Sequence, residues 1–255
     1  MISLERLPNF RDAGDLPTAE GRRLRAGRLF RSELPSLLSA RDRAVLAGLS
    51  IALVCDLRTA RERRRRPATV LATARRAWVP LHEDPRYDVG VGDLARFLVA
   101  REGEARFRAV VARYYRHLVL ERASQLGAVL LALPQREGAS SWVHCTAGRD
   151  RTGLVVALVQ RTLGVPEPRV LASYRETDER YAVRLERLAR VLRAATLRTV
   201  SDARMHTVLR TQPEILGTVL GELVARHGSI EGYVRQACGV GEEDLRALGR
   251  WLLVP

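Results

Sequence analysis

The sequence contains no lysine, so arginine supplies all 43 of its basic residues. With 29 acidic residues, the formal net charge is +14, and such a charge would suit a nucleic-acid or membrane partner. Complete use of arginine is, however, typical of a coding preference, and no basic patch interleaved with aromatic residues is present. We therefore expect no nucleic-acid partner, whereas the positive field favours acidic substrates.

Cysteine and long apolar runs are also scarce. The three cysteines, Cys55, Cys145 and Cys238, are odd in number and far apart, which argues against a disulfide framework and favours a reducing compartment. No apolar run is long enough to span a membrane, and the first residues lack the layout of a secretory signal. We expect a cytoplasmic protein, with secretion without a leader as the alternative.

Neither a linker, nor a repeat, nor a low-complexity segment divides the 255 residues, which predicts a single domain over 1–255. Short apolar runs alternate with segments of helical spacing, the pattern of an α/β protein. We expect strands at 28–32, 51–55, 77–81 and 141–144. We expect helices after Ser32, from Ser39 to Gly48, and over 93–120 (with a break near Gly103), 126–133, 154–163, 182–197, 213–224 and 242–253.

One stretch, 142–153, combines a strand, a loop and the start of a helix. Cys145 opens the loop, and Arg151 closes it. A loop that enters a helix presents unpaired backbone N–H groups and the positive end of the helix dipole. Such a loop suits an anion the size of phosphate, stabilises a thiolate at Cys145 and allows Arg151 to clamp two phosphate oxygens.

The string HCTAGRDRTG resembles the HCxAGKDRTG loop of bacterial cysteine-dependent phosphatases that act on tyrosine, on dual-specificity substrates and on phosphoinositides. This resemblance implies a mostly parallel sheet flanked by helices, and hydrolysis through a phosphocysteine on Cys145, without metal or cofactor. The phosphate is then bound by Arg151 and by the rest of the loop: Thr146, Ala147, Gly148, Arg149 and Thr152. His144 would fix the loop, and Thr152 would bond the Cys145 sulfur.

Two other segments resemble the same family near its active site. The first is Asn9–Asp12 (NFRD), in which we expect Arg11 and Asp12 to orient one another or the phosphate loop. The second is the DLR-x-x-x-E segment that begins at Asp56. We expect Asp56 to bond the loop or pair with its arginines, and Arg58 to approach the phosphate. The run of arginines at 63–66 reads as a solvated face.

The leaving group needs a proton donor, and three carboxylates are candidates. Asp150 lies inside the loop and is the first choice, although the flanking arginines should lower its pKa. The polar loop at 82–90 supplies the alternatives Asp84 and Asp88. In many cysteine phosphatases a loop at this position carries the acid.

The substrate remains open between phosphotyrosine proteins and phosphoinositides. Lysine is usual where this chain has Arg149, which puts the lipid activity in doubt. The family often has a helical insertion at about 90–120, which here would be a lid or a packed helix. The arginine-rich helix at 182–197 could make weak contact with a membrane surface.

Two rival classes of protein are less well supported. A phosphate-binding pseudoenzyme would normally lack Cys145 or Arg151, and both are present. A rhodanese-like sulfur transferase also has a loop cysteine, but not the Gly-Arg-Asp-Arg-Thr-Gly continuation. We therefore expect a protein-tyrosine phosphatase, with phosphoinositide or dual specificity as the alternative.

Overall fold

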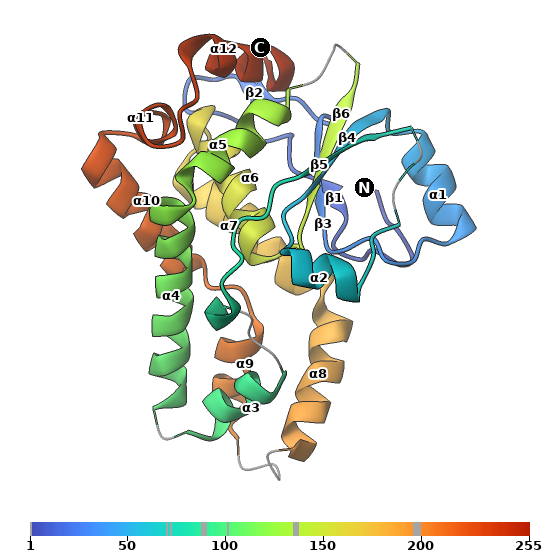
Figure 1. The fold of residues 1–255 in the computed structure, drawn as a ribbon, viewed down its shortest axis with the longest axis vertical. Coiled ribbons are helices and arrows are strands. Elements are labelled where there is room, and N and C mark those ends of the chain that lie inside the picture. Colours follow the sequence, from blue (N-terminus) through green and yellow to red (C-terminus); the bar gives the residue numbers. More distant parts are fainter. Residues whose placement is uncertain are drawn as a thin grey trace.

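The computed structural model describes residues 2–69, 71, 73–87, 91–100, 102–134, 138–195 and 200–255. Its centre is a five-stranded sheet in the order β1-β3-β6-β4-β5 (Figure 1). The strands are β1 (Arg11–Asp12), β3 (Leu29–Ser32), β4 (Ile51–Asp56), β5 (Arg75–Trp78) and β6 (Ser140–His144). Only β1, at one edge, is antiparallel to its neighbour. The predicted α/β class with a mostly parallel sheet is confirmed.

Helices cover both faces of this sheet, and therefore the central strand β6 is buried at every residue. On one face lie α5 (Ala123–Ala132), α6 (Asp150–Thr162) and α11 (Ile230–Gln236), and the largest apolar core packs there. On the other face lie the N-terminal segment and α1 (Ala40–Ala47), around Phe10, Phe30 and Trp142 (Figure 1). This layering places the carboxyl ends of the parallel strands at one edge.

Four helices form a helical lobe beyond that edge (Figure 1): α3 (Val91–Val99), α4 (Gly103–Glu121), α8 (Ala182–Ala195) and α9 (Asp202–Leu209). They have a small apolar core of their own, which includes Leu98, Phe107, Leu192 and Met205. Helices α3 and α4 are the pair expected over 93–120: α3 ends at Val99 and α4 begins at Gly103. The sequence did not predict α9.

The remaining elements begin and end at recognisable local signals. They are α2 (Ala60–Arg65), α7 (Glu167–Arg180), α10 (Pro213–His227), α12 (Glu242–Leu252), the 3₁₀ turn η1 (Pro85–Tyr87), and a small sheet of β2 (Arg23–Leu24) with β7 (Leu253–Val254). Ser39 caps α1 and Thr59 caps α2, each by accepting an N–H of the first turn. Proline begins α10.

Two sequence predictions about local structure were wrong. No helix begins directly after Ser32, and the first helix starts only at Ala40. The Ser32 hydroxyl does not cap a helix, because it accepts the Trp142 Nε1–H at 2.9 Å and donates to the Glu33 carbonyl. Strand β5 begins two residues before the predicted 77 and ends at Trp78.

The three cysteines are free thiols. Among the described residues, no helix is both long and apolar enough to cross a membrane.

Candidate active site

Cys145 lies where β6 ends, at the floor of a cavity of about 520 Å³ between the sheet and the helical lobe. The loop continues through Arg149, and α6 begins at Asp150. Every loop residue except Gly148 lines the cavity, as does Arg151. The structure thus brings together the predicted nucleophile, the predicted arginine and most of the predicted phosphate-binding loop.

The carbonyl oxygens of residues 146–148 are bound by groups outside the loop. The Leu34 N–H donates to the Thr146 carbonyl at 3.2 Å, and the Tyr181 hydroxyl donates to the Ala147 carbonyl at 2.6 Å. The Gly148 carbonyl accepts from Asn9 at 3.2 Å and from Arg31 at 2.8 Å. Because the carbonyls point outward, the loop N–H groups are left for the concave side, which makes an anion-binding nest.

One of these amides already points at the nucleophile. The Gly148 N–H donates to Cys145 Sγ at 3.2 Å. A hydrogen bond from an amide stabilises a sulfur anion, as does the positive end of the α6 dipole. The Gly148 N–H and the N-terminus of α6 are thus both directed at the sulfur that the sequence predicts as the nucleophile.

Arg151 is held in place by Glu62 of α2. Its two terminal nitrogens donate to the two Glu62 oxygens at 2.6 and 2.7 Å, a bidentate ion pair. Burial raises the pKa of Glu62, but the hydrogen bonds and charge of Arg151 outweigh this and hold the pKa at about 2. Glu62 also accepts the Thr146 hydroxyl. Glu62 thus binds Thr146 near the start of the phosphate loop and Arg151 at its end. The Arg151 N–H groups that do not bind Glu62 remain for a ligand.

No role was predicted for Glu62, although the sequence around it contains a signal. Thr59 and Glu62 form a capping box, in which Glu62 accepts the Thr59 N–H at 2.8 Å and the Thr59 hydroxyl accepts the Glu62 N–H at 3.1 Å. The box fixes the first turn of α2 and thereby aims Glu62 at Arg151. Three further residues that hold the loop were also not predicted: Asn9, Arg31 and Tyr181. They bind loop carbonyls that are distant from them in sequence.

We expect Glu62→Gln to lower kcat/KM about 10- to 100-fold, or about 1.4 to 2.7 kcal/mol of transition-state stabilisation. The amide keeps the shape of Glu62 but not the charge that holds Arg151. Steady-state kinetics with an aryl phosphate would measure the loss. Glu83→Gln is the matched control, because Glu83 is exposed and accepts the Ala60 N–H of the same helix without touching Arg151. Equal activity of the two variants would contradict this role of Glu62.

Asp150 is the acceptor for three donors. Arg149 Nε donates to it at 3.0 Å, the Tyr115 hydroxyl at 3.1 Å and the Tyr174 hydroxyl at 3.3 Å. Burial opposes ionisation, yet Arg149 and the hydrogen bonds hold the pKa of Asp150 below its usual value. The Arg149 guanidinium also donates to the Leu209 carbonyl at 3.0 Å. Asp150 and Arg149 thus connect the loop to α4, α7 and α9.

His144 supports the loop as a neutral ring. Its Nδ1 lies 3.2 Å from the Cys145 carbonyl oxygen, and burial lowers the pKa of His144 to about 4. A neutral imidazole orients the loop but adds no positive charge near the sulfur at neutral pH. Thr152 differs from expectation: its buried hydroxyl bonds to none of the described residues, and the sulfur accepts from Gly148 instead.

The low pKa of His144 makes stability depend on pH. An unfolded histidine takes up a proton near pH 6.5, whereas the folded ring does so near pH 4. Between these values the unfolded chain binds the extra proton, so this contribution is complete above pH 6.5 and is lost as pH falls toward 4. The loss is on the order of 3 kcal/mol.

We therefore expect the stability difference between wild type and His144→Asn to shrink as pH falls from 6.5 to about 4. Asparagine can still donate to the Cys145 carbonyl but does not titrate. Urea unfolding at a series of pH values measures both free energies of unfolding. A difference that stays constant with pH would show that His144 does not titrate as described.

Arg11 and Asp12 do not orient one another. Arg11 donates to the side chain and carbonyl of Asn9, and Asn9 in turn binds the phosphate loop. Arg11 therefore acts on the loop through Asn9. Asp12 instead accepts the N–H groups of Gly14 and Gly27. Asp12 closes a turn next to β1, and its predicted role at the phosphate loop was wrong.

Asp56 and Arg58 pair with each other rather than with the phosphate loop. Arg58 Nε and Nη2 donate to the two Asp56 oxygens at 2.9 and 2.7 Å, and Nη1 donates to the Arg66 carbonyl at 2.6 Å. Neither residue lines the cavity of Cys145. The expectation that Arg58 approaches the phosphate was therefore wrong, because its guanidinium is bound to Asp56 at the end of β4 and to the Arg66 carbonyl just after α2.

Asp84 does not line the cavity either. It accepts from Arg86 within the turn η1, and these hydrogen bonds lower the pKa of Asp84 to about 2. Asp88, the other carboxylate considered in this loop, lies outside the described residues. Among the described parts of the chain, no three His, Cys, Asp or Glu side chains lie together as a metal site would require.

The wall opposite the phosphate loop is aromatic and apolar. His82, Tyr87 and Tyr114 line it, with ring centroids 5.1 Å apart for the two tyrosines and 5.4 Å apart for His82 and Tyr114. Leu94 of α3 and Phe107 of α4 complete it. Side chains of α3 and α4 thus form one wall of the cavity of Cys145.

Comparison with known proteins agrees with this geometry. A profile of the tyrosine phosphatase family matches residues 2–254. A tyrosine-protein phosphatase homologue of Cupriavidus necator is 31% identical over 96% of this chain and 86% of its own length. The triple specificity protein phosphatase PtpB of Mycobacterium tuberculosis is 30% identical over 96% of each chain.

A solved structure, that of P. aeruginosa TpbA, shares 19% identity with a TM-score of 0.31, over 69% of this chain and 90% of that one. This likeness is too weak to support an argument. The family match and the two relatives each extend over nearly the whole chain. This chain belongs to the tyrosine phosphatase family.

Proposed function

We propose that the chain hydrolyses phosphotyrosine in proteins through a phosphocysteine on Cys145. The observation that carries this proposal is the loop itself, in which the carbonyls of residues 146–148 are bound from outside and the Gly148 N–H donates to Cys145 Sγ. The Cys145 thiolate attacks phosphorus, and the bond to the leaving oxygen breaks. Loop amides and Arg151 stabilise the charge on the equatorial oxygens.

Water then attacks the phosphocysteine, which releases inorganic phosphate and restores the thiolate. The buried hydroxyl of Thr152 has no partner among the described residues, and it is available to hydrogen-bond the departing sulfur. Such a thiolate mechanism requires reduced cysteine. A cytoplasmic setting therefore fits this proposal.

The aromatic wall supports phosphotyrosine over phosphoserine as substrate. The rings of Tyr114, Tyr87 and His82 face the cavity that holds Cys145, and aromatic surfaces pack well against a phenyl ring. An alkyl phosphate gains less from this wall. The name of the mycobacterial relative describes three specificities, so we propose activity on phosphoserine and phosphothreonine only at a lower rate.

The substrate class is tested with matched phosphotyrosine, phosphothreonine and phosphoserine peptides in the presence of a chelator. We expect the highest kcat/KM for phosphotyrosine. Turnover of phosphoserine at an equal or higher rate would overturn the preference. Absence of any turnover, with phosphate still bound, would leave a phosphate-binding protein.

Phosphoinositides are the second candidate substrates, and Arg149 bears on them. Arg149 lines the cavity, but it also donates to Asp150 and to the Leu209 carbonyl. A guanidinium held at both places has little freedom to reach further phosphates of a lipid headgroup. We therefore propose that lipid turnover is slower than peptide turnover. The exposed Val183 and Val191 on α8 would favour weak contact with a membrane surface.

For the proton donor, the contacts of Asp150 argue against a protonated resting state. Its three donors and its lowered pKa support a positioning role, and the lowered pKa of Asp84 disfavours that residue as well. We propose that Asp150 fixes Arg149 and the start of α6. This role and a proton-donor role predict different dependence on the leaving group.

We expect Asp150→Asn to lower kcat about tenfold, about 1.4 kcal/mol, by the same factor for an activated aryl phosphate and for an alkyl phosphate. Loss of a general acid would instead cost more as the leaving-group pKa rises, and it would remove the basic limb of the pH profile of kcat. Kinetics of both substrates from pH 5 to 9 separate the two roles. Tyr174→Phe is the companion variant, which weakens the same anchor without removing a carboxylate.

A further inference from the structure

A second cavity, of about 600 Å³, lies on the other side of α2. The two faces of this short helix line different cavities. Arg61, Glu62 and Arg65 line the cavity of Cys145, whereas Ala60, Arg63 and Arg64 line the second one. From the sequence, the arginine run at 63–66 was expected to be a solvated face, but two of its members, Arg63 and Arg64, line this concave site.

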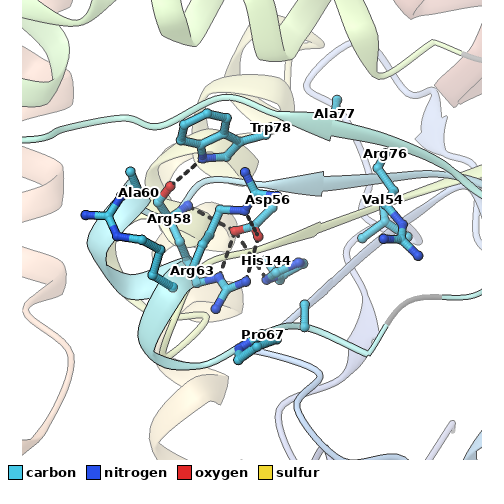
Figure 2. A pocket seen from close by; sticks show the side chains of 12 residues that line it. Val54, Asp56, Arg58, Ala60, Arg63, Pro67, Arg76, Ala77, Trp78 and His144 are labelled. Atoms are coloured by element: carbon cyan, nitrogen blue, oxygen red, sulfur yellow. Dashed lines mark hydrogen bonds and ion pairs between the residues drawn. The ribbon is translucent and has the colours of Figure 1, made fainter.

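The walls of the second cavity come from β4, β5 and the segment after α2 (Figure 2). Val54 and Arg76 are opposite each other in the parallel pair β4–β5, and Asp56 is opposite Trp78. These four side chains line the cavity together. Its volume falls within the range of small-ligand pockets, about 300–1,000 Å³.

The charges that line this cavity are mostly positive. Asp56 is its only acidic side chain among the lining residues, and Arg58 neutralises Asp56 through a bidentate ion pair. Arg63 lies 4.5 Å from the centre of the Trp78 ring and 3.5 Å from Asp56. Within the described parts of the chain, Arg64 and Arg76 form no ion pair. The cavity thus has a surplus of guanidinium groups.

Two buried polar side chains make the cavity more than a cluster of surface arginines. Arg58 is 1% exposed and His144 is fully buried, and both line it. His144 Nε2 has no hydrogen-bond partner among the residues described. Because the neutral ring donates through Nδ1 to the Cys145 carbonyl, Nε2 is an acceptor, and a hydroxyl group on the organic part of a ligand, rather than a phosphate oxygen, would satisfy it. Figure 2 shows the His144 ring beside the Arg58–Asp56 pair, with Arg63, Arg76 and Trp78 around it.

We propose that this second cavity binds the phosphate group of a small soluble phosphate ester. Guanidinium groups bind phosphate through paired, charge-assisted hydrogen bonds, and Arg64 and Arg76 are available for them. The half-exposed Trp78 ring offers a surface for the organic part of the ligand. The site is separate from Cys145, so its occupation does not depend on the catalytic activity proposed above.

Binding is measured on the Cys145→Ser chain, which cannot turn over a ligand. Inorganic phosphate and inositol 1,4,5-trisphosphate are titrated at fixed ionic strength, with calorimetry and tryptophan fluorescence as readouts. Trp78 is 45% exposed, whereas Trp142 and Trp251 are buried, so fluorescence reports mainly on the second cavity. We expect two binding events, and a fluorescence change in only one of them.

Arg64→Gln with Arg76→Gln should weaken the fluorescent event at least tenfold and leave the other unchanged. Arg64→Gln alone should weaken it about threefold. Trp78→Phe should remove the fluorescence change but retain the event in calorimetry. The matched control is Arg169→Gln with Arg226→Gln, which removes the same charge from exposed positions that line neither cavity and should retain both events.

A single binding event, or two events unaffected by Arg64→Gln with Arg76→Gln, would overturn the proposal. Equal weakening by the control pair would reduce the effect to net charge and would also overturn it. Vesicles that contain a phosphoinositide provide the last arm. If the chain bound these vesicles in a way that required Arg64 and Arg76, but bound neither soluble ligand, the ligand of the cavity would be a lipid headgroup on a membrane and not a soluble ester.

Discussion

Cys145→Ser is expected to abolish hydrolysis, with a loss of at least about 10⁴-fold in kcat, while phosphate still binds. Serine is nearly isosteric, so the loop amides and Arg151 remain in place, but its hydroxyl is not ionised at neutral pH and is a far weaker nucleophile. The loss corresponds to about 5.5 kcal/mol of the activation barrier. Hydrolysis of an aryl phosphate in chelator, with phosphate binding by calorimetry, measures both quantities.

Cys238→Ser is the control for this substitution. Burial raises the pKa of Cys238 to about 11, so that thiol has no thiolate to contribute at neutral pH. We expect this variant to retain wild-type kcat. Residual turnover in Cys145→Ser above about one part in 10⁴, or an equal loss in Cys238→Ser, would contradict Cys145 as the nucleophile.

Gly148→Ala is expected to have the second-largest effect, lowering kcat/KM about 100-fold or more and destabilising the fold by about 2–4 kcal/mol. Gly148 has a φ of +62°, a conformation that costs a non-glycine residue about 1 kcal/mol or more. A methyl group there would also collide with the Ser32 carbonyl and the Glu33 N–H. The loop must then move, which displaces the N–H that donates to Cys145 Sγ.

A second glycine separates the two causes. Gly239 has a φ of +72° but open space around the position of a Cβ atom. Gly239→Ala should therefore show the backbone cost alone, about 1 kcal/mol, with unchanged kcat/KM. Thermal or urea unfolding gives the stabilities, and steady-state kinetics gives the activity. If Gly148→Ala behaved like Gly239→Ala in both measurements, the close approach of Gly148 to Ser32 would have no part in shaping the loop.

The sequence predicted the parts of the site that are local in the chain. A buried strand, a loop with Cys145 and Arg151, and an apolar helix follow one another within 142–163, so no distant contact was needed to recognise them. The same holds for the α1 cap at Ser39, where side chain and backbone are three residues apart. Local patterns of this kind survive into the folded chain because tertiary packing reinforces them.

The contacts that hold the loop could not be predicted in this way. Glu62 meets Arg151 across 89 positions, and Arg31 meets the Gly148 carbonyl across 117. Which polar group binds a given carbonyl depends on how β3, β6 and α2 are placed against one another. Arg58 shows the converse error: its segment lies near the active site, but its guanidinium is bound to Asp56 and to the Arg66 carbonyl instead of facing the cavity. Helix α9 was missed because its eight residues gain stability from the small core of the helical lobe rather than from a long periodic pattern.

The most direct test of the account is to trap the covalent intermediate. A phosphotyrosine peptide is mixed with the wild-type chain in chelator, the reaction is stopped with acid within its first turnovers, and the protein is digested for mass spectrometry. We expect a phosphoryl group on the wild-type peptide that contains Cys145, and none on the corresponding peptide of Cys145→Ser. Full turnover with phosphate transferred directly to water, and no phosphorylated Cys145 at any time, would contradict it.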